Sequence, residues 1–242
     1  MQRAMPWRSA ARTDLGKVRA RNEDAFFDGS QQGLWAVADG MGGHSGGDIA
    51  SQLIVSNLAQ LPMLRDLDER CKAVRHCLRW TNRRLSQELT VTAAQGAAIM
   101  GSTVVVLLLE GNRGICVWAG DSRCYLWRGR RLYQLSRDHS LQQQMIHKQH
   151  LSPEQARAHP AAKALTRAVG AAHELTLEVL ELEVKVGDTF LLCSDGLYQE
   201  LSCEALGTAL SLASPSTALA RIFTEVLEGA ARDNVTGVVI GR

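Results

Sequence analysis

The stretch TVVVLLLEGNRGICVWA, residues 103–119, holds two apolar segments on either side of Glu110-Gly111-Asn112. Short apolar runs separated by turn-forming residues are typical of an antiparallel hairpin. A second hairpin is indicated where segments 125–127 and 132–135 flank Arg128-Gly129-Arg130. We therefore expect an antiparallel sheet assembled from hairpins.

Helices are predicted between the strands of this sheet. Further short apolar segments predict strands at 34–38, 175–184, 189–193 and 235–240. Helical periodicity indicates helices at 48–61, from a cap at Asp66 (with Glu69 in capping-box position) to Leu89, and at 216–230. Strands clustered in hairpins with helices set between them favour an α/β sandwich with antiparallel sheets over βαβ crossovers.

A polar, His- and Gln-rich segment, about 138–168, interrupts this pattern. Ser152 is placed to cap a short helix within it. A polar excursion between strands is typical of a lid or flap over a site, and equally of a passive surface insertion. The segment is a candidate flap within a single expected domain, residues 1–242.

Composition places the chain among ordinary globular proteins. It has 242 residues, 45% hydrophobic and 21% charged, and a net charge of +2. This charge predicts no strong attraction to nucleic acid or membrane. Six cysteines without a CxxC pair indicate reduced packing residues, and the basic N-terminus lacks the apolar region of a secretory signal. The longest apolar run is too short to span a bilayer, so a cytoplasmic protein, by default monomeric, is expected.

Aspartates recur at the ends of the predicted strands. Asp39-Gly40, Asp121-Ser122 and Asp195-Gly196 each follow a strand, and Asp233 precedes the last one. Carboxylates gathered at one sheet edge repel each other unless a cation lies between them. Oxygen ligands without a Cys/His cluster suit Mg²⁺, Mn²⁺ or Ca²⁺. A single Asp-Gly pair is usually only a turn former, but four such sites favour a metal centre.

The N-terminal segment adds two acids and an arginine. Glu23 and Asp24 are adjacent, and Arg19 precedes Glu23 by four residues. A guanidinium can grip two phosphate oxygens. A surface salt bridge explains the same spacing equally well.

The ordered set of motifs resembles the PPM family, the metal-dependent (type 2C) protein serine/threonine phosphatases, and is most similar to stand-alone bacterial members. The resemblance runs from about Thr13 to Ile240. It rests on Arg19-x-x-Asn22-Glu23-Asp24, Asp39-Gly40-Met41-Gly42-Gly43-His44, Gly101-Ser102-Thr103, Gly120-Asp121-Ser122-Arg123, Asp138-His139-Ser140, Leu165-Thr166-Arg167, Ser194-Asp195-Gly196 and Asp233-Asn234.

This resemblance implies an α+β fold, a four-layer α/β sandwich in which two central, mostly antiparallel sheets are flanked by helices. It also implies two Mn²⁺ or Mg²⁺ ions, with a possible third, and hydrolysis by metal-activated water without a phosphoenzyme. By match of position, Asp39 bridges both metals and Arg19 binds phosphate. The other implied metal ligands are Asp195 and Asp233 at one site, the Gly40 carbonyl at the other, Glu23 and Asp24 through water, and Asp121 at the third.

One position departs from the family pattern. Animal members carry His directly after the Asp-Gly pair, where this chain has Met41. His44 lies three residues further on and is a candidate to protonate the leaving group. A structural role for His44 in its glycine-rich loop is an equal alternative, so the general acid stays open.

Other motifs give weaker alternatives. Cys77 to Arg83 and Cys124 to Arg130 match C-x5-R, but neither has the glycine-rich anion cradle of a cysteine phosphatase. Gly42 to Gly47 has P-loop spacing, with Asp48 where a lysine is needed. His147 and His150 fit a solvated face better than a zinc pair.

Three functions compete on the implied fold. The preferred one is a phosphatase acting on phosphoserine and phosphothreonine of proteins and opposing a bacterial serine/threonine kinase. The resemblance suggests a kinase–phosphatase pair that controls a bacterial process such as a secretion apparatus. The second is a catalytically silent phosphoprotein-binding module on the same fold. Such a module would be expected to lack some metal ligands, whereas every expected ligand is present in this sequence. A phosphatase of anti-anti-sigma type regulators usually lacks the Arg-x-x-Asn-Glu-Asp element. Non-protein phosphoesters stay open as substrates.

Overall fold

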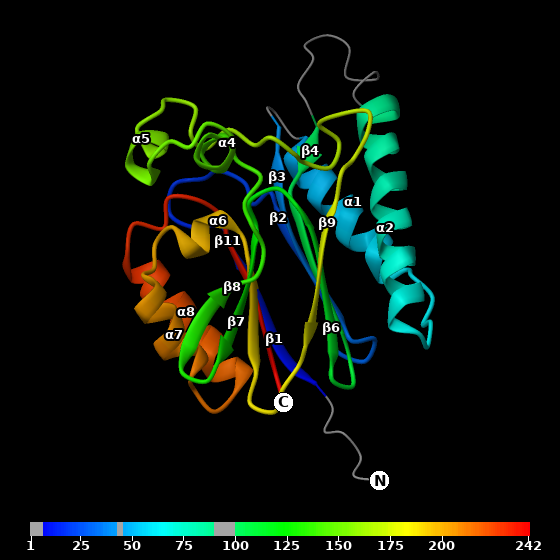
Figure 1. Ribbon diagram of the computed structural model, residues 1–242, viewed down its shortest axis with the longest axis vertical. Coiled ribbons are helices and arrows are strands. Elements are labelled where there is room, and N and C mark those ends of the chain that lie inside the picture. Colours follow the sequence, from blue (N-terminus) through cyan, green and yellow to red (C-terminus); the bar gives the residue numbers. More distant parts are fainter. Residues whose placement is uncertain (1–6, 43–45, 90–99) are drawn as a thin grey trace.

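A computed structural model describes residues 7–42, 46–89 and 100–242 of the chain. Two β-sheets lie face to face at the centre, with helices on both outer sides (Figure 1). Every pair of neighbouring strands in these sheets is antiparallel. The predicted α+β sandwich with antiparallel sheets is confirmed.

The first sheet has the strand order β1-β11-β10-β7-β8. Its members are β1 (Arg8–Asp14), β11 (Val235–Gly241), β10 (Thr189–Cys193), β7 (Arg123–Arg128) and β8 (Arg131–Gln134). The outermost residues of β1 and β11 pair with each other, Arg8 with Gly241 and Asp14 with Val235. The first and last strands of the chain are therefore neighbours in one sheet.

The second sheet has the order β2-β3-β5-β6-β9, with the short strand β4 paired to the end of β3. Its members are β2 (Asp24–Gly29), β3 (Leu34–Met41), β4 (Gly101–Ser102), β5 (Val104–Glu110), β6 (Arg113–Ala119) and β9 (Glu178–Glu183). The hairpin predicted across Gly111 is the β5–β6 pair, in which Glu110 faces Arg113.

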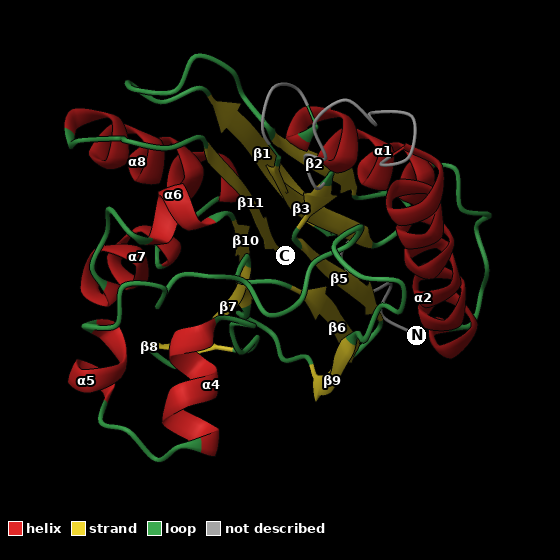
Figure 2. Cartoon of the chain, turned by 90° about the horizontal axis from the view of Figure 1, so that it is seen from above, coloured by secondary structure: helices red, strands yellow, loops and turns green. Residues whose placement is uncertain are grey.

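Alternating side chains on the strands build three buried layers. On β3, Trp35 and Val37 face the other sheet and join Phe190 and Ile240 in the central core. Ala36, between them, packs toward the helices instead. Because successive side chains of a strand point to opposite faces, a strand that is apolar on both faces must be covered on both. The four layers follow from this requirement (Figure 2).

Helices α1 (Gly47–Ala59) and α2 (Leu67–Arg83) cover the second sheet. The Asp66 carboxylate caps α2 by accepting a hydrogen bond from the Glu69 backbone N–H. The helix predicted to reach Leu89 changes at Arg84 into a short π-helix, η1 (Arg84–Leu89).

Helices α7 (Cys203–Leu210) and α8 (Pro215–Glu228) cover the first sheet. The third predicted helix corresponds to α8, which begins one residue earlier than expected and ends at Glu228. No helix in the described ranges is long and apolar enough to cross a membrane.

The candidate flap, 138–168, contains α4 (Leu141–Lys148) and α5 (Pro153–Arg157). Ser152 caps α5 with a complete capping box. Backbone hydrogen bonds tie the two ends of the segment together, from Leu141 N–H to Ala164 C=O and from Thr166 N–H to His139 C=O. All six cysteines are free; most are buried and Cys203 is exposed.

Candidate metal centre

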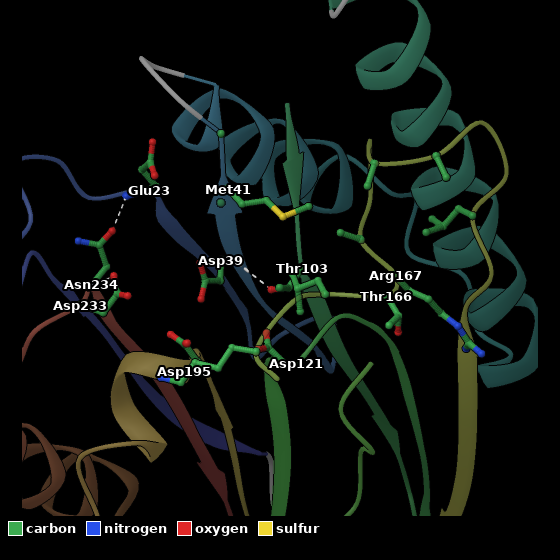
Figure 3. Close-up of a pocket in the computed structure, with 18 of the residues that line it drawn as sticks. Glu23, Asp39, Met41, Thr103, Asp121, Thr166, Arg167, Asp195, Asp233 and Asn234 are labelled. Carbon is green, nitrogen blue, oxygen red and sulfur yellow. Dashed lines mark hydrogen bonds between the residues drawn. The ribbon is translucent and has the colours of Figure 1, made fainter. Parts of the chain in front are cut away.

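A cavity of about 1150 Å³ opens where several strands of both sheets end. Five of the acids expected to serve metal ions line this acidic cavity, namely Glu23, Asp39, Asp121, Asp195 and Asp233, and Glu174 is a sixth carboxylate in its lining. Figure 3 shows the four aspartates around one opening, each from a different element, with Glu23 above them. The predicted convergence of the strand-end aspartates is present in the structure.

The pairing of β2 with β3 sets Asp24 directly opposite Asp39. Like charges opposite each other on neighbouring strands are destabilising. Burial, followed by the neighbouring carboxylates, raises the pKa of Asp39 well above its usual range. Burial likewise raises the pKa of Asp24 to about 6, although its carboxylate accepts a hydrogen bond from Ser194 Oγ at 2.7 Å. The fold thus holds negative charge at a point where a cation would stabilise it.

Asp121 follows β6 after Gly120 and is also largely buried. Burial, with the nearby carboxylates of Asp195 and Asp138, raises the pKa of Asp121 to about 7. The preceding Gly120 is held at both backbone groups by His139: its N–H donates to Nδ1 at 3.1 Å, and its C=O accepts from the His139 N–H at 2.9 Å. His139 therefore fixes the backbone that presents Asp121.

Asp195 and Asp233 are oriented by different partners. Asp195 begins α6 (Asp195–Tyr198), and its carboxylate accepts a hydrogen bond from Gln199 Nε2 at 2.5 Å. Asp233 forms an ion pair with Arg19, whose Nη2 lies 2.6 Å from Oδ2. Burial, then the charge of Asp233, raises the pKa of Asp195. The predicted phosphate-binding guanidinium thus lies at the edge of the acidic cavity.

Asn234 holds the segment that carries Arg19 and Glu23. Its Nδ2 donates to the C=O groups of Leu15 (3.0 Å) and Arg21 (2.9 Å). Its Oδ1 accepts from the backbone N–H of Glu23 at 2.8 Å. One buried amide therefore fixes both ends of this segment against the start of β11.

The glycines after the aspartates are required for close backbone approach. A Cβ on Gly40 would lie 2.1 Å from the C=O oxygen of Gly47, and one on Gly196 would lie 2.1 Å from the C=O oxygen of Asn234. Both contacts are shorter than atoms tolerate. These Asp-Gly pairs are packing junctions between the elements of the site, not only turns.

The donor set fits a hard divalent cation. The carboxylates that line the acidic cavity offer oxygen donors, and no Cys or His is among its described lining residues. Oxygen ligands are those that Mg²⁺ and Mn²⁺ prefer. Within the described ranges, no three or more His, Cys, Asp or Glu side chains are already grouped around one metal position. Three of the carboxylates are instead engaged in hydrogen bonds, Asp195 with Gln199, Asp233 with Arg19 and Asp24 with Ser194. Metal binding would require some of them to exchange partners.

Most of the sequence-predicted residues lie at this one site. The cavity is lined by Arg19, Glu23, Asp39, Gly40, Asp121, Asp195 and Asp233. Asp24 is buried beside Asp39 instead of lining the cavity wall. His44 falls outside the described residues, so its predicted role as an acid stays a prediction.

Sequence reasoning missed the residues that position the ligands. The Asp39 backbone donates its N–H to Thr103 Oγ1 at 3.1 Å and accepts at its C=O from the Ser102 hydroxyl at 3.0 Å. Ser194 and Asn234 have similar roles toward Asp24 and Glu23. The signal available was their presence in the same short motifs as the acids.

The weaker motifs gain no support from the structure. Cys77 lies within α2, and Cys124 is a buried residue of β7 whose pKa is raised well above the usual range of a thiol. A reactive cysteine needs the opposite shift. His147 lies in the last turn of α4 and belongs to no group of three metal-ligating side chains in the described part of the chain.

An acidic cavity with an arginine at its edge, at one end of an antiparallel α/β sandwich, is the arrangement that the resemblance to metal-dependent phosphatases implies. The sequence model of the family Protein phosphatase 2C matches residues 17–236, and the chain belongs to this family. The family predicted from the motifs is confirmed.

Individual relatives agree with this assignment. Serine/threonine protein phosphatase PstP of Mycobacterium tuberculosis is 36% identical over 232 residues, which cover 96% of this chain and 44% of that protein. The chain thus spans less than half the length of the curated relatives it matches first. PppA of Pseudomonas aeruginosa, a key regulatory component of T6SS, is 40% identical with a TM-score of 0.89, covering 98% of both chains. The catalytic domain of PstP in complex with 2 manganese ions is 34% identical with a TM-score of 0.83, covering 97% of both.

Proposed function

We propose that this chain hydrolyses phosphoserine and phosphothreonine on proteins with the help of Mn²⁺ or Mg²⁺. The observation that carries the proposal is that five of the predicted metal-serving acids and Arg19 line one cavity. Family membership and the manganese-bound relative support it. A silent binding module is disfavoured, because each acid expected to serve a metal lies in or beside this cavity.

Within this proposal, Asp39, Asp195, Asp233 and the Gly40 carbonyl would hold two metal ions, Glu23 and Asp24 would act through water, and Asp121 would serve a third. When bound, the ions supply an activated water for attack on phosphorus and offset the charge of the phosphoryl oxygens.

Arg19 would position the phosphate. Its guanidinium is half exposed and bonded to Asp233 at 2.6 Å, at the edge of the acidic cavity. A guanidinium can hold two phosphoryl oxygens at once. Replacing Arg19 by Ala should chiefly raise KM; if KM and kcat are both unchanged, Arg19 has no part in the site.

The candidate flap is supported as part of the same site. This segment contributes to the lining of the acidic cavity with residues that include Lys163, Leu165, Thr166 and Arg167. The Lys163 ammonium also donates to Gln199 Oε1 at 2.6 Å, and Gln199 in turn holds Asp195. We infer that the flap forms one wall of the substrate site within a single domain, residues 1–242.

The partners would be phosphorylated proteins and a serine/threonine kinase whose action the chain reverses. The free cysteines support a cytoplasmic enzyme, and the modest net charge supports one that needs neither nucleic acid nor a membrane. A monomer is the default expectation. The likeness to PppA supports a regulatory role in a secretion apparatus. Comparison of phosphoproteins in cells carrying the chain or its Asp195→Asn variant tests this role.

The decisive experiment measures hydrolysis of a phosphothreonine peptide by metal-stripped protein after addition of Mn²⁺, Mg²⁺, Zn²⁺ or EDTA. We expect activity with Mn²⁺ or Mg²⁺ and none from Asp195→Asn. Folded protein that is inactive with every metal would exclude the proposal and favour the binding module or a non-protein phosphoester.

A further inference from the structure

The acidic cavity continues away from the carboxylates into an apolar arm. We define the apolar arm by the lining residues Met41, Ala168, Ala171, Ala172 and Leu175. The whole cavity, about 1150 Å³, exceeds the roughly 300–1,000 Å³ of a pocket for a drug-sized ligand. A phosphorylated side chain alone would leave the apolar arm unfilled.

The wall of the apolar arm is held rigidly by Asn82, a buried residue of α2. Its Oδ1 accepts from the N–H of Gly170 at 2.7 Å. Its Nδ2 donates to the C=O groups of Ala172 (2.9 Å) and His173 (3.2 Å). Leu175 is buried and joins the core beneath α1 and α2. A wall fixed in this way needs little ordering when a ligand binds, which favours affinity.

The apolar arm is also fixed relative to the carboxylates. Ser102 and Val169 exchange two backbone hydrogen bonds, of 2.9 and 2.8 Å. The hydroxyl of the same Ser102 donates to the C=O of Asp39 at 3.0 Å. A single residue of β4 therefore links the wall of the apolar arm to the aspartate at the centre of the acidic cavity.

One charge lies in the wall of the apolar arm. Glu174 lines the cavity and forms no ion pair with any described residue. Arg167, which lines the same cavity, forms its ion pair with Glu178 instead, with Nη1 3.0 Å from Oε1 and 3.2 Å from His139 Nε2. An acidic ligand group placed here would meet an uncompensated carboxylate.

We propose that the apolar arm is a preformed subsite for an apolar side chain next to the phosphorylated residue of a protein substrate, and that Glu174 excludes acidic residues from it. This inference rests on the proposed phosphatase function. It adds a substrate preference that the metal centre alone would not produce.

The test uses phosphothreonine peptides in which each neighbouring position in turn is Leu, Ala or Glu. They are assayed with the Mn²⁺-loaded protein, and p-nitrophenyl phosphate serves as a substrate without neighbours. At one position we expect kcat/KM for Leu to exceed that for Glu by at least about tenfold, the discrimination that apolar pockets reach. Glu174→Lys should reduce this ratio, mainly by improving hydrolysis of the Glu peptide.

Two variants separate the apolar arm from general effects. Ala172→Trp fills the apolar arm and should raise KM for the Leu peptide more than for the Ala peptide. Glu228→Lys makes the same charge reversal at an exposed site at the end of α8, outside the cavity, and should leave the Leu-to-Glu ratio as in the wild type.

The outcomes are distinguishable. Equal hydrolysis of all the peptides, or a preference that survives both Glu174→Lys and Ala172→Trp, would overturn the subsite and leave the phosphatase function standing. Failure to hydrolyse the peptides and p-nitrophenyl phosphate alike would overturn the proposed function and, with it, the subsite.

Discussion

At the scale of single residues, the site is organised around two aspartates that face each other. Asp24 and Asp39 pair across β2 and β3, and the pKa values of both are raised by burial and by neighbouring acids. An acid whose pKa is raised in the folded state destabilises the fold when it is ionised. The same two side chains that would serve the metals therefore cost stability when no cation is bound.

Replacing Asp39 by Asn separates these two effects. We expect kcat to fall at least about a hundredfold, because loss of even an outer partner of a metal ligand costs roughly 10–100-fold. In EDTA, however, the variant should melt at a higher temperature than the wild type, since one buried charge is gone. Phosphopeptide kinetics measure the loss of kcat, and thermal unfolding in EDTA measures the change in Tm.

The control is Asp68→Asn, which removes a surface partner of Arg113 and should change neither kcat nor Tm. A lower Tm for Asp39→Asn than for the wild type would contradict the repulsion between Asp24 and Asp39.

Replacing Asn234 tests a residue that acts by positioning other residues of the site. Asn234→Ala would leave the Leu15 and Arg21 carbonyls and the Glu23 N–H without their partner. We expect a loss of about 1–3 kcal/mol in the free energy of unfolding, the usual penalty for unpaired buried groups, together with a raised KM, since Arg19 is no longer held. Asn57→Ala removes a hydrogen bond from Asn57 Nδ2 to Thr81 Oγ1, between α1 and α2, and should lower stability alone. Equal kinetics in the two variants would argue against positioning.

At the scale of elements, α2 carries the anchor for the apolar arm and depends on its own cap. Asp66→Ala removes the hydrogen bond from the Glu69 N–H and should cost about 1 kcal/mol of unfolding free energy in urea titrations. Because the cap lies at the opposite end of α2 from Asn82, kcat and KM should not change. A kinetic effect as large as that of Asn234→Ala would mean that the whole helix moves with its cap.

The elements also show what the sequence could predict. Strand β10 has the predicted bounds, because its apolar run ends sharply at Ser194 and Asp195. Strand β1 was not predicted, since RSAARTD is polar and half exposed at a sheet edge. Residues 175–177 were expected in a strand but precede β9, and Leu175 packs into the core from a loop. Helix α4 was missed because only Met145 in it is buried.

For the site, the sequence indicated the acids but not their partners. An aspartate that ends a strand is visible in one motif, whereas the pairing of Asp24 with Asp39 depends on the register between two strands. The three hydrogen bonds of Asn234 join segments that are more than 200 residues apart in sequence. Such contacts form only when β1 pairs with β11, so no local sequence pattern predicts them.

At the scale of the whole molecule, metal, pH and stability are linked. The pKa values of Asp24 and Asp121 rise from about 4 to about 6 and about 7 on folding. A raised folded-state pKa contributes stability below the unfolded value, and this contribution is lost as pH rises through the folded value. The metal-free protein should therefore lose stability between about pH 4 and pH 7 at these two groups.

Thermal unfolding at several pH values, in EDTA and in Mn²⁺, measures this linkage. We expect Tm in EDTA to fall toward neutral pH, and Mn²⁺ to raise Tm most at pH 7, where the carboxylates are ionised. In Asp121→Asn the pH dependence in EDTA should be weaker. A Mn²⁺ effect that is the same at pH 5 and pH 7 would contradict the linkage.

The pairing of β1 with β11 also determines how the molecule can be rearranged. Arg8 and Gly241 are partners at one end of the first sheet, far from the acidic cavity at the other end of the strands (Figure 1). A short linker between them would close the backbone into a ring, and chains with adjoining ends tolerate circular permutation. The tight turn at Gly111, where an added Cβ would meet no other atom, is then a place to cut. The same proximity means that a domain joined next to Arg8 of β1 or Gly241 of β11 would lie at the end of the first sheet away from the acidic cavity.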